Sequence, residues 1–242
     1  MVKKPETAMI FAAGLGTRML PLTEDTPKPM VEVCGKPIID YRIDQLKEIG
    51  VKKIIINTFH LADKIKEHLS NVKDVEIIIS HEDERLETGG GLVKALEYLG
   101  DEPFYVSNSD VILIDRNSNA LERLAKTWDA EKMDMLFLMH PIERAIGYHG
   151  NGDFDLDKNG QIMVASSEKK PFVFTGMQIL NPKVLEGYKA EPFSLSEIFM
   201  KAKNENGFLD RVYGIINEGD WLHIGTVEDI KVAENFLSCS IE

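Results

Sequence analysis

Short apolar runs alternate with longer amphipathic segments through the first 140 residues of the chain. The runs are rich in Ile, Val and Phe and predict strands at 9–13, 54–56, 75–80, 104–107 and 135–139. The segments between them carry apolar residues at helical spacing and predict helices at 37–50, 62–69, 91–99 and 119–128. This alternation is typical of a sheet whose strands are joined by crossover helices.

The pattern changes after residue 140. Periodicity weakens between residues 141 and 172, where Gly147, Gly150, Gly152 and Gly160 indicate hairpins. The chain then predicts a strand at 172–180, a helix at 196–204, a strand at 209–216 and a helix at 226–237. We expect one α/β domain over residues 1–242, a three-layer sandwich with a mixed, mostly parallel sheet and a smaller lobe that begins at about residue 141.

The chain is acidic, with 28 Lys and Arg against 40 Asp and Glu and a net charge of -12. This balance disfavours nucleic-acid and anionic-membrane partners, so a phosphate site would have to be a local basic pocket. The two cysteines, Cys34 and Cys239, are too few for a disulfide framework or a zinc knuckle. No apolar signal core follows Met1, and no apolar run approaches the length of a membrane span. These features predict a soluble, cytoplasmic protein.

A loop with two glycines follows the first predicted strand directly and reads Ala12-Ala13-Gly14-Leu15-Gly16-Thr17-Arg18-Met19. Glycines at such a position let backbone N–H groups close around an anion. The loop lacks the Lys-Ser/Thr ending of a Walker A motif and the third glycine of the dinucleotide fingerprint. Arg18 adds a forked phosphate donor, and Lys28 lies on a segment stiffened by Pro27 and Pro29. By itself the pattern fits a phosphate-binding loop or a tight turn beside a solvated lysine.

Longer motif strings occur in a fixed order along nearly the whole chain. They are the loop at 12–19 with Pro21-Leu22-Thr23 and Thr26-Pro27-Lys28-Pro29, then Glu87-Thr88-Gly89-Gly90-Gly91, Asn108-Ser109-Asp110, Gly152-Asp153-Phe154, Phe174-Thr175-Gly176 and Trp221-Leu222-His223-Ile224-Gly225-Thr226. Together they resemble the nucleoside-diphosphate-sugar pyrophosphorylases, which are sugar-1-phosphate nucleotidyltransferases. The short length and the string at 87–91 are most similar to the N-acetylmuramate 1-phosphate uridylyltransferases, and mannose-1-phosphate guanylyltransferases share much of the pattern.

The resemblance implies a Rossmann-like (GT-A-like) fold with a nucleotide-binding part over about 1–140 and a sugar-phosphate-binding part over about 141–242. It implies transfer of UMP from UTP to N-acetylmuramate 1-phosphate or a similar sugar phosphate, with release of pyrophosphate. The implied catalytic residues are Arg18, Lys28 and Asp110. The implied nucleotide-binding residues are Ala13, Gly14, Leu15, Gly16, Thr17, Arg18, Lys28, Glu87, Thr88, Gly89 and Gly90. Without the resemblance, the string at 87–91 would be interpreted as the first turn of a helix.

The resemblance also implies a Mg²⁺ site built around Asp110, which follows a predicted strand. The second metal ligand of the family is normally an aspartate two residues after the tryptophan, and this chain has His223 there. Asp220 differs in parity from His223, so an extended segment would direct the two side chains to opposite faces. Because Mg²⁺ prefers oxygen ligands, His223 is expected to bind Mg²⁺ weakly, to favour Mn²⁺, or to contact phosphate as a donor. A purely structural histidine is the remaining alternative.

For the sugar phosphate, the resemblance points to Asn108, Asp153, Glu168, Lys169 and Gly176. The Glu168-Lys169 pair belongs to a Glu-Lys-Lys-Pro stretch in which Lys170 shifts the family's Glu-Lys-Pro register. Surface lysines beside a proline are equally expected to be solvated. The resemblance covers monomers and oligomers alike, so a homo-oligomer stays open. A different class, a nucleotide- or sugar-phosphate-binding module without turnover, is suggested by His223 in place of a metal carboxylate.

Overall fold

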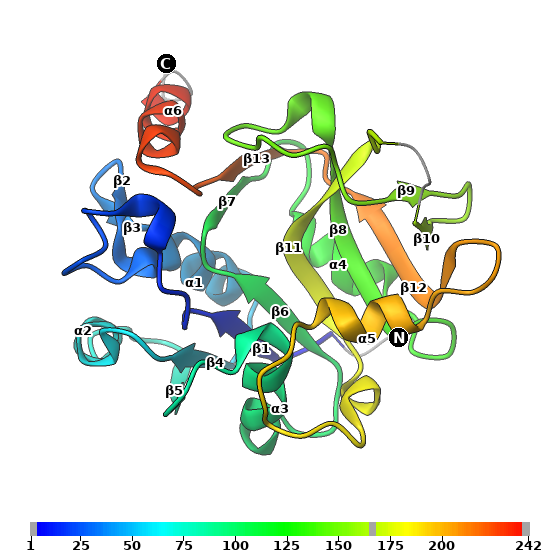
Figure 1. Ribbon diagram of the computed structural model, residues 1–242, viewed down its shortest axis with the longest axis horizontal. Helices are drawn as coiled ribbons and strands as arrows, with labels where there is room; N and C mark the ends of the chain where they lie inside the picture. The colour runs from blue at the N-terminus through cyan, green and yellow to red at the C-terminus, as the bar shows by residue number, and fades with distance from the viewer. Residues whose placement is uncertain (1–3, 165–167, 239–242) are drawn as a thin grey trace.

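The structure is a computed structural model, and it describes residues 4–164 and 168–238 (Figure 1). The α-helices are α1 (Ile38–Glu48), α2 (Ala62–Leu69), α3 (Glu87–Leu99), α4 (Ala120–Thr127), α5 (Ser196–Lys201) and α6 (Val227–Ser238). The strands are β1 (Thr7–Phe11), β2 (Glu32–Val33), β3 (Lys36–Pro37), β4 (Lys53–Thr58), β5 (Glu76–His81), β6 (Phe104–Asn108), β7 (Val111–Ile114), β8 (Met135–Pro141), β9 (Asp155–Leu156), β10 (Gln161–Met163), β11 (Phe172–Leu180), β12 (Phe208–Ile216) and β13 (Asp220–His223). Short 3₁₀ turns lie at η1 (Thr17–Met19), η2 (Lys28–Met30), η3 (Ile142–Arg144) and η4 (Pro182–Leu185).

A mixed sheet runs through the molecule in the order β5-β4-β1-β6-β11-β8-β12-β10-β9. The strands β5, β4, β1 and β6 are parallel, and β11 enters antiparallel between β6 and β8. Two small pairs, β13 with β7 and β2 with β3, flank this sheet. Because the parallel strands end at one edge, the loops that follow β1, β4 and β6 lie together there, where ligands of open α/β sheets bind.

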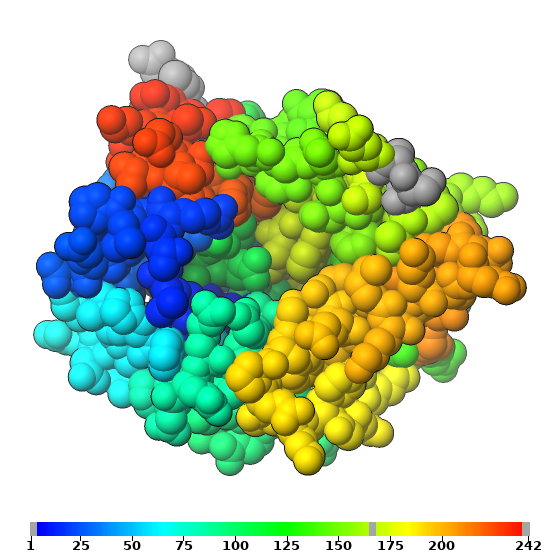
Figure 2. Space-filling model, in the orientation of Figure 1, coloured from blue at the N-terminus to red at the C-terminus, as the bar shows by residue number. Residues whose placement is uncertain are grey.

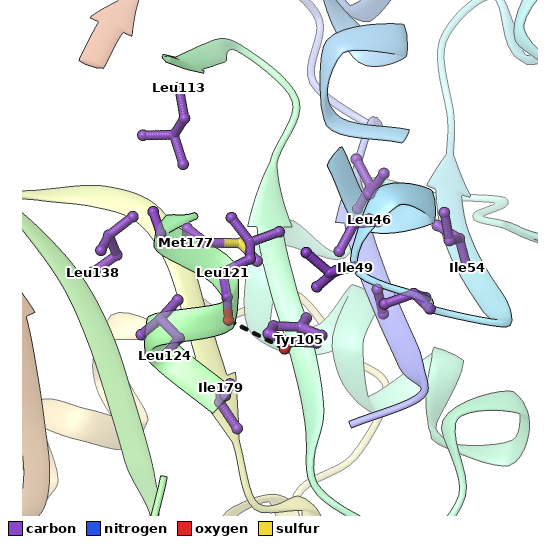
Figure 3. Close-up of a cluster of buried hydrophobic side chains, with 14 of the residues drawn as sticks. Leu46, Ile49, Ile54, Tyr105, Leu113, Leu121, Leu124, Leu138, Met177 and Ile179 are labelled. Carbon is purple, nitrogen blue, oxygen red and sulfur yellow. Dashed lines mark hydrogen bonds between the residues drawn. The ribbon is translucent and has the colours of Figure 1, made fainter. Parts of the chain in front are cut away.

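Helices cover both faces of the sheet, because side chains of each strand alternate between the two faces. Along β4, Ile54 and Ile56 join the cluster under α1, α2 and α4, whereas Ile55 joins the cluster under α3 and α5. Figure 3 shows the first cluster, in which the Tyr105 hydroxyl donates to the Leu121 backbone carbonyl at 3.3 Å. The predicted three-layer α/β sandwich with a mixed sheet is therefore confirmed.

A third cluster lies under α6, which packs beside the β2–β3 hairpin at one edge of the molecule (Figure 1). Through Met19, Ile112 and Leu222, this cluster joins the η1 turn at the end of the glycine loop to β7 and β13. The sequence pattern did not predict these two strands. In the described part of the chain, no helix has the length and apolarity needed to cross a lipid bilayer.

Most predicted elements agree with the structure within a few residues, and the start of α3 is the informative difference. The helix begins at Glu87 instead of residue 91, so the string at 87–91 forms its first turn, as the interpretation without the family resemblance predicts. Glycines are poor helix formers, so local propensity argues against Gly89, Gly90 and Gly91 as helical residues. The structure holds this turn by tertiary contact, because the N–H groups of Gly89 and Gly90 donate to the Phe193 carbonyl at 2.9 Å and 3.4 Å.

Candidate active site

A pocket of about 300 Å³ opens where β1, β4 and β6 end. Figure 2 shows the hollow at the centre of this face, between the blue N-terminal loop and the gold segment around α5. The pocket is lined by Phe11, Ala13, Gly14, Gly16, Thr17, Arg18, Lys28, Pro29, Asn57, Arg85, Glu87, Thr88, Asn108, Ser109, Asp110 and Gly225. Segments from five separate parts of the chain therefore meet in one cavity of ligand size.

The glycine loop turns sharply at Gly16, which has a φ of +67°. A Cβ atom there would lie 3.0 Å from both Lys28 Cβ and Thr23 Cγ2, so glycine satisfies the conformation and the packing together. The Thr23 hydroxyl donates to the Gly16 carbonyl at 2.8 Å and fixes the turn. Gly14 is exposed, and a Cβ added to it would meet nothing within 4 Å. Its backbone is open to an anion in the pocket.

Lys28 and Asp110 form the ionic centre of the pocket. Lys28 Nζ lies 2.6 Å from Asp110 Oδ2, and their side chains are only 12% and 22% exposed, so solvent screens the pair weakly. Burial raises the pKa of Asp110, but the charge and the hydrogen bond of the Lys28 ammonium outweigh it and hold that pKa below its usual range. Asp110 is therefore ionised at neutral pH.

His223 faces the same carboxylate from β13, with its Nε2 4.0 Å from Asp110 Oδ2. Its Nδ1 lies 3.2 Å from the Gly147 carbonyl. A carbonyl oxygen only accepts, so this bond requires the hydrogen on Nδ1 and leaves the lone pair of the neutral ring on Nε2. The ring also stacks on Trp221 at a centroid separation of 5.9 Å. Asp220 points away and pairs with Arg116 at 2.6 Å, as the strand period predicts.

The groups around Asp110 suit a divalent cation that is shared with a bound anion. Asp110 Oδ1 is buried and has no hydrogen-bond partner among the described residues. Asp110 Oδ1 and the Nε2 lone pair of His223 together offer a cation one oxygen ligand and one nitrogen ligand. Within residues 4–164 and 168–238, no three His, Cys, Asp or Glu side chains gather closely enough to hold a metal. Phosphate oxygens or water would have to complete the coordination sphere.

The start of α3 forms another wall of the pocket. Glu87 has a φ of +59°, a conformation uncommon for a residue with a side chain, and it pairs with Arg85 across the pocket rim. Gly89 and Gly90 lie behind this wall. A Cβ at Gly89 would come within 2.2 Å of the Phe193 ring, and one at Gly90 within 2.1 Å of the Glu191 carbonyl. Their lack of side chains therefore admits a neighbouring segment of the same chain.

The predicted sugar-phosphate residues are distributed unevenly. Asn108 lines the pocket, and Gly176, with a φ of +81°, lies so close that a Cβ there would be 2.7 Å from Asn108 Nδ2. Asp153 Oδ2 accepts a hydrogen bond from the Phe174 N–H at 2.8 Å. Burial raises the pKa of Asp153, against the lowering influence of that N–H and of Lys170. Glu168 and Lys169 are exposed and lie outside the pocket lining.

Comparison with known proteins places the chain among nucleotide-transferring enzymes. The family model described as nucleotidyl transferase matches residues 7–239. The chain belongs to the nucleotidyl transferase family. It is 36% identical over 240 residues to the N-acetylmuramate alpha-1-phosphate uridylyltransferase of Caulobacter vibrioides, covering 97% of this chain and 98% of that protein. The family resemblance seen in the motif strings is therefore confirmed.

Two further relatives extend this comparison. The chain is 31% identical to the catalytic subunit beta of mannose-1-phosphate guanylyltransferase of Drosophila pseudoobscura pseudoobscura, over 92% of this chain and 60% of that protein. Among solved structures, HddC from Yersinia pseudotuberculosis, complexed with GMP-PN, has a TM-score of 0.75 and 26% identity and covers 96% of this chain and 99% of that chain. The two chains thus share one fold over nearly their whole length.

In this nucleotidyl transferase, ten predicted site residues line one pocket: Ala13, Gly14, Gly16, Thr17, Arg18, Lys28, Glu87, Thr88, Asn108 and Asp110. Leu15, Gly89, Gly90, Asp153, Gly176 and His223 lie outside the lining, and His223 reaches the site through Asp110. Sequence reasoning missed Asn57 and Arg85, which also line the pocket. Asn57 is a polar residue directly after the apolar run at 54–56 of β4, a position that could have marked it. The adjacency of β4 and β1, however, is not visible in the sequence.

Proposed function

We propose that the chain transfers UMP from UTP to N-acetylmuramate 1-phosphate or a similar sugar 1-phosphate and releases pyrophosphate. The observation that carries this proposal is the pocket in which an open glycine loop, Arg18 and Lys28 meet Asp110. The relative from Caulobacter vibrioides, which matches nearly end to end, bears the name of this activity. An acidic chain that concentrates Arg18 and Lys28 in one pocket is suited to a polyanionic substrate.

The triphosphate is proposed to lie along the glycine loop. The open backbone at Gly14, the turn held at Gly16 and the guanidinium of Arg18 can bind its oxygens. Lys28 Nζ, already positioned by Asp110, neutralises the charge that develops on the α-phosphate as the sugar phosphate oxygen attacks in line. The reaction then requires positioning and charge neutralisation, and no covalent intermediate on the protein.

Asp110 and His223 are the residues proposed to hold a divalent cation, Mg²⁺ or Mn²⁺. When bound, the cation would neutralise phosphate oxygens of the nucleotide. The orphaned Asp110 Oδ1 and the lone pair on His223 Nε2 support this assignment. A nitrogen ligand favours Mn²⁺ more than an all-oxygen site does. Mn²⁺ binding, measured by electron paramagnetic resonance, tests the ligand set independently of turnover. The variant His223→Ala is expected to bind Mn²⁺ more weakly than wild type.

The base is proposed to lie against Glu87 and Thr88, with the Gly89-Gly90 turn behind them. The sugar phosphate is proposed to contact Asn108, Asp153, Gly176, Glu168 and Lys169. These roles divide the domain into a nucleotide-binding part over about 1–140 and a sugar-phosphate-binding part over about 141–242. Such an enzyme would supply nucleotide sugar in the cytoplasm for the recycling of peptidoglycan, as a monomer or a homo-oligomer.

The proposed function is tested by pyrophosphate release from the purified protein. Each of UTP, GTP, CTP and dTTP is paired with the 1-phosphates of N-acetylmuramate, mannose, glucose and N-acetylglucosamine, in Mg²⁺ and in Mn²⁺. We expect turnover with UTP and N-acetylmuramate 1-phosphate. Nucleotide binding without pyrophosphate release from any pair, in either metal, would reject the proposal in favour of a binding module.

A second candidate is mannose-1-phosphate guanylyltransferase. The relative from Drosophila pseudoobscura pseudoobscura bears that name, and HddC was solved with GMP-PN. In the same panel, turnover with GTP and mannose 1-phosphate in place of UTP and N-acetylmuramate 1-phosphate would favour this candidate.

A further inference from the structure

Two buried polar side chains connect the glycine loop to the start of α3. Asn57, at the carboxyl end of β4, is 2% exposed, and Glu82, just after β5, is 1% exposed. Neither side chain belongs to the proposed chemistry, although Asn57 lines the pocket. A buried carboxylate is costly unless hydrogen bonds compensate it, so this pair calls for an explanation.

The hydrogen bonds of the pair converge on the Glu82 carboxylate, from Asn57 on one side and from Leu86 on the other. The Ala12 N–H donates to Asn57 Oδ1 at 2.8 Å, and Asn57 Nδ2 donates to Glu82 Oε1 at 2.7 Å. The Leu86 N–H then donates to Glu82 Oε2 at 3.0 Å. Because a backbone N–H can only donate, the orientation of the Asn57 amide is fixed at its first bond. The chain Ala12–Asn57–Glu82–Leu86 is thus a continuous polar bridge.

The two ends of this bridge belong to different walls of the pocket. Ala12 is the first residue of the glycine loop, and Leu86 precedes Glu87 and Thr88 on the wall formed by α3. Backbone pairing supports the same connection, because the Glu82 N–H donates to the Thr58 carbonyl at 2.8 Å. The bridge therefore spans the gap between the phosphate side and the base side of the proposed nucleotide site.

The glycine at position 91 leaves room for the bridge. A Cβ added there would lie 2.6 Å from Glu82 Oε1 and 2.9 Å from Asn57 Nδ2, the two atoms of the central hydrogen bond. Its φ is in the ordinary range, so the backbone conformation does not require glycine. The bridge therefore requires glycine at position 91, because any side chain there would push Asn57 and Glu82 apart.

We propose that Asn57 and Glu82 are positioning residues that set the spacing between the phosphate and base subsites of the nucleotide site. The proposal rests on the proposed function, because it requires one NTP to contact both walls. Neither residue needs to touch the reacting atoms. With the spacing correct, binding of one end of the nucleotide places the other end at its subsite, and the two contacts reinforce each other.

The test reverses the central hydrogen bond. Asn57→Asp places a second carboxylate against Glu82, and Glu82→Gln places a second amide against Asn57. The double variant Asn57→Asp/Glu82→Gln keeps the net charge of the pair and all three hydrogen bonds, with the central donor now on the glutamine. Binding of UTP, uridine and inorganic triphosphate is measured by calorimetry at pH 8, where a proton shared between two carboxylates is least available.

Each single variant is expected to bind UTP about tenfold more weakly, the effect of losing one hydrogen bond to a buried charged group. Uridine and triphosphate, which each occupy one subsite, are expected to keep their affinities within about twofold. The double variant should recover wild-type UTP affinity. A remote control, Asp134→Asn, removes a carboxylate that pairs with Arg211 at 3.0 Å, and it should lower thermal stability without changing UTP affinity.

The outcomes separate the two proposals. Wild-type protein that binds none of the four NTPs overturns the proposed function. If wild-type protein binds UTP and both single variants bind it equally well, only the proposed role of the bridge is overturned. An equal loss of affinity for UTP, uridine and triphosphate in the single variants overturns it as well. If Asn57→Asp does not fold, the comparison of Glu82→Gln with the double variant still tests the bridge. A double variant that binds UTP no more tightly than Glu82→Gln also overturns the proposed role of the bridge.

Discussion

Gly90→Ala distinguishes local helix propensity from tertiary packing, because the two predict opposite changes in stability. Gly90 lies in the first turn of α3, where alanine would by propensity stabilise the helix by about 1 kcal/mol. The structure places the new Cβ 2.1 Å from the Glu191 carbonyl oxygen and 2.9 Å from its carbon. These are backbone atoms that no side-chain rotation can move away, so α3 and the segment at 191–193 would have to separate.

The expected cost follows from this separation. Overpacking of a well-packed contact costs about 1–3 kcal/mol. Moving the segment away also weakens the hydrogen bonds from Gly89 and Gly90 to the Phe193 carbonyl, each worth about 1 kcal/mol. Set against the gain in propensity, the variant is expected to be less stable by about 2 kcal/mol, which lowers the melting temperature of a domain of this size by roughly 4–8 °C.

Urea unfolding at 25 °C, followed by circular dichroism, measures the free energy of unfolding of wild type and variant. Gly14→Ala is the matched control, since its Cβ meets nothing within 4 Å and its φ lies in the ordinary range. It should stay within about 0.5 kcal/mol of wild type. A Gly90→Ala variant as stable as wild type or more stable would refute the close packing of residues 191–193 on α3.

Three further predictions test the ionic centre, the sugar side and the core. Lys28→Met should lower the free energy of unfolding by about 1–3 kcal/mol at pH 7, because the partly buried Asp110 carboxylate loses its cation. Since Lys28 helps hold the pKa of Asp110 below its unfolded value, the wild-type gain is present above about pH 4 and disappears as pH falls through the folded pKa, so urea unfolding at pH 3 should show a smaller difference. Asp153→Asn keeps an acceptor for the Phe174 N–H and should raise the KM for the sugar phosphate by about tenfold in pyrophosphate-release assays, with the KM for NTP unchanged. Asn119→Ala removes the side-chain cap of α4 and should lower the stability measured by thermal unfolding by about 1 kcal/mol. Asn119→Asp, which can still cap the helix, should keep most of the wild-type stability.

The local periodicity of apolar residues predicted much of the fold. Alternation between apolar runs and amphipathic segments predicted the layered α/β sandwich, and the strand at Phe172–Leu180 was predicted with its observed bounds. The strands β7 and β13 were missed. They are four residues each, so neither is long enough to show a clear alternation of apolar and polar residues in the sequence.

The candidate site divides in the same way. The glycine loop, Arg18, Lys28 and Asp110 stand in motif strings that a reader of the sequence can find, and they line one pocket. Asn57 carries no such motif. It meets Ala12 across 45 positions and Glu82 across 25, through a sheet order that places β4 beside β1. Its part in the site arises from strand pairing, which the sequence pattern leaves open.

The sequence by itself determined the alternation of elements and the family, because these depend on residues close together in the chain. Only the tertiary structure decided how this glycine-rich turn of α3 is held, with Gly89 against Phe193 and Gly90 against Glu191. The physical reason is that the acceptor for the first turn of this helix, the Phe193 carbonyl, comes from a segment about a hundred residues later, and its contribution appears only once the chain has folded.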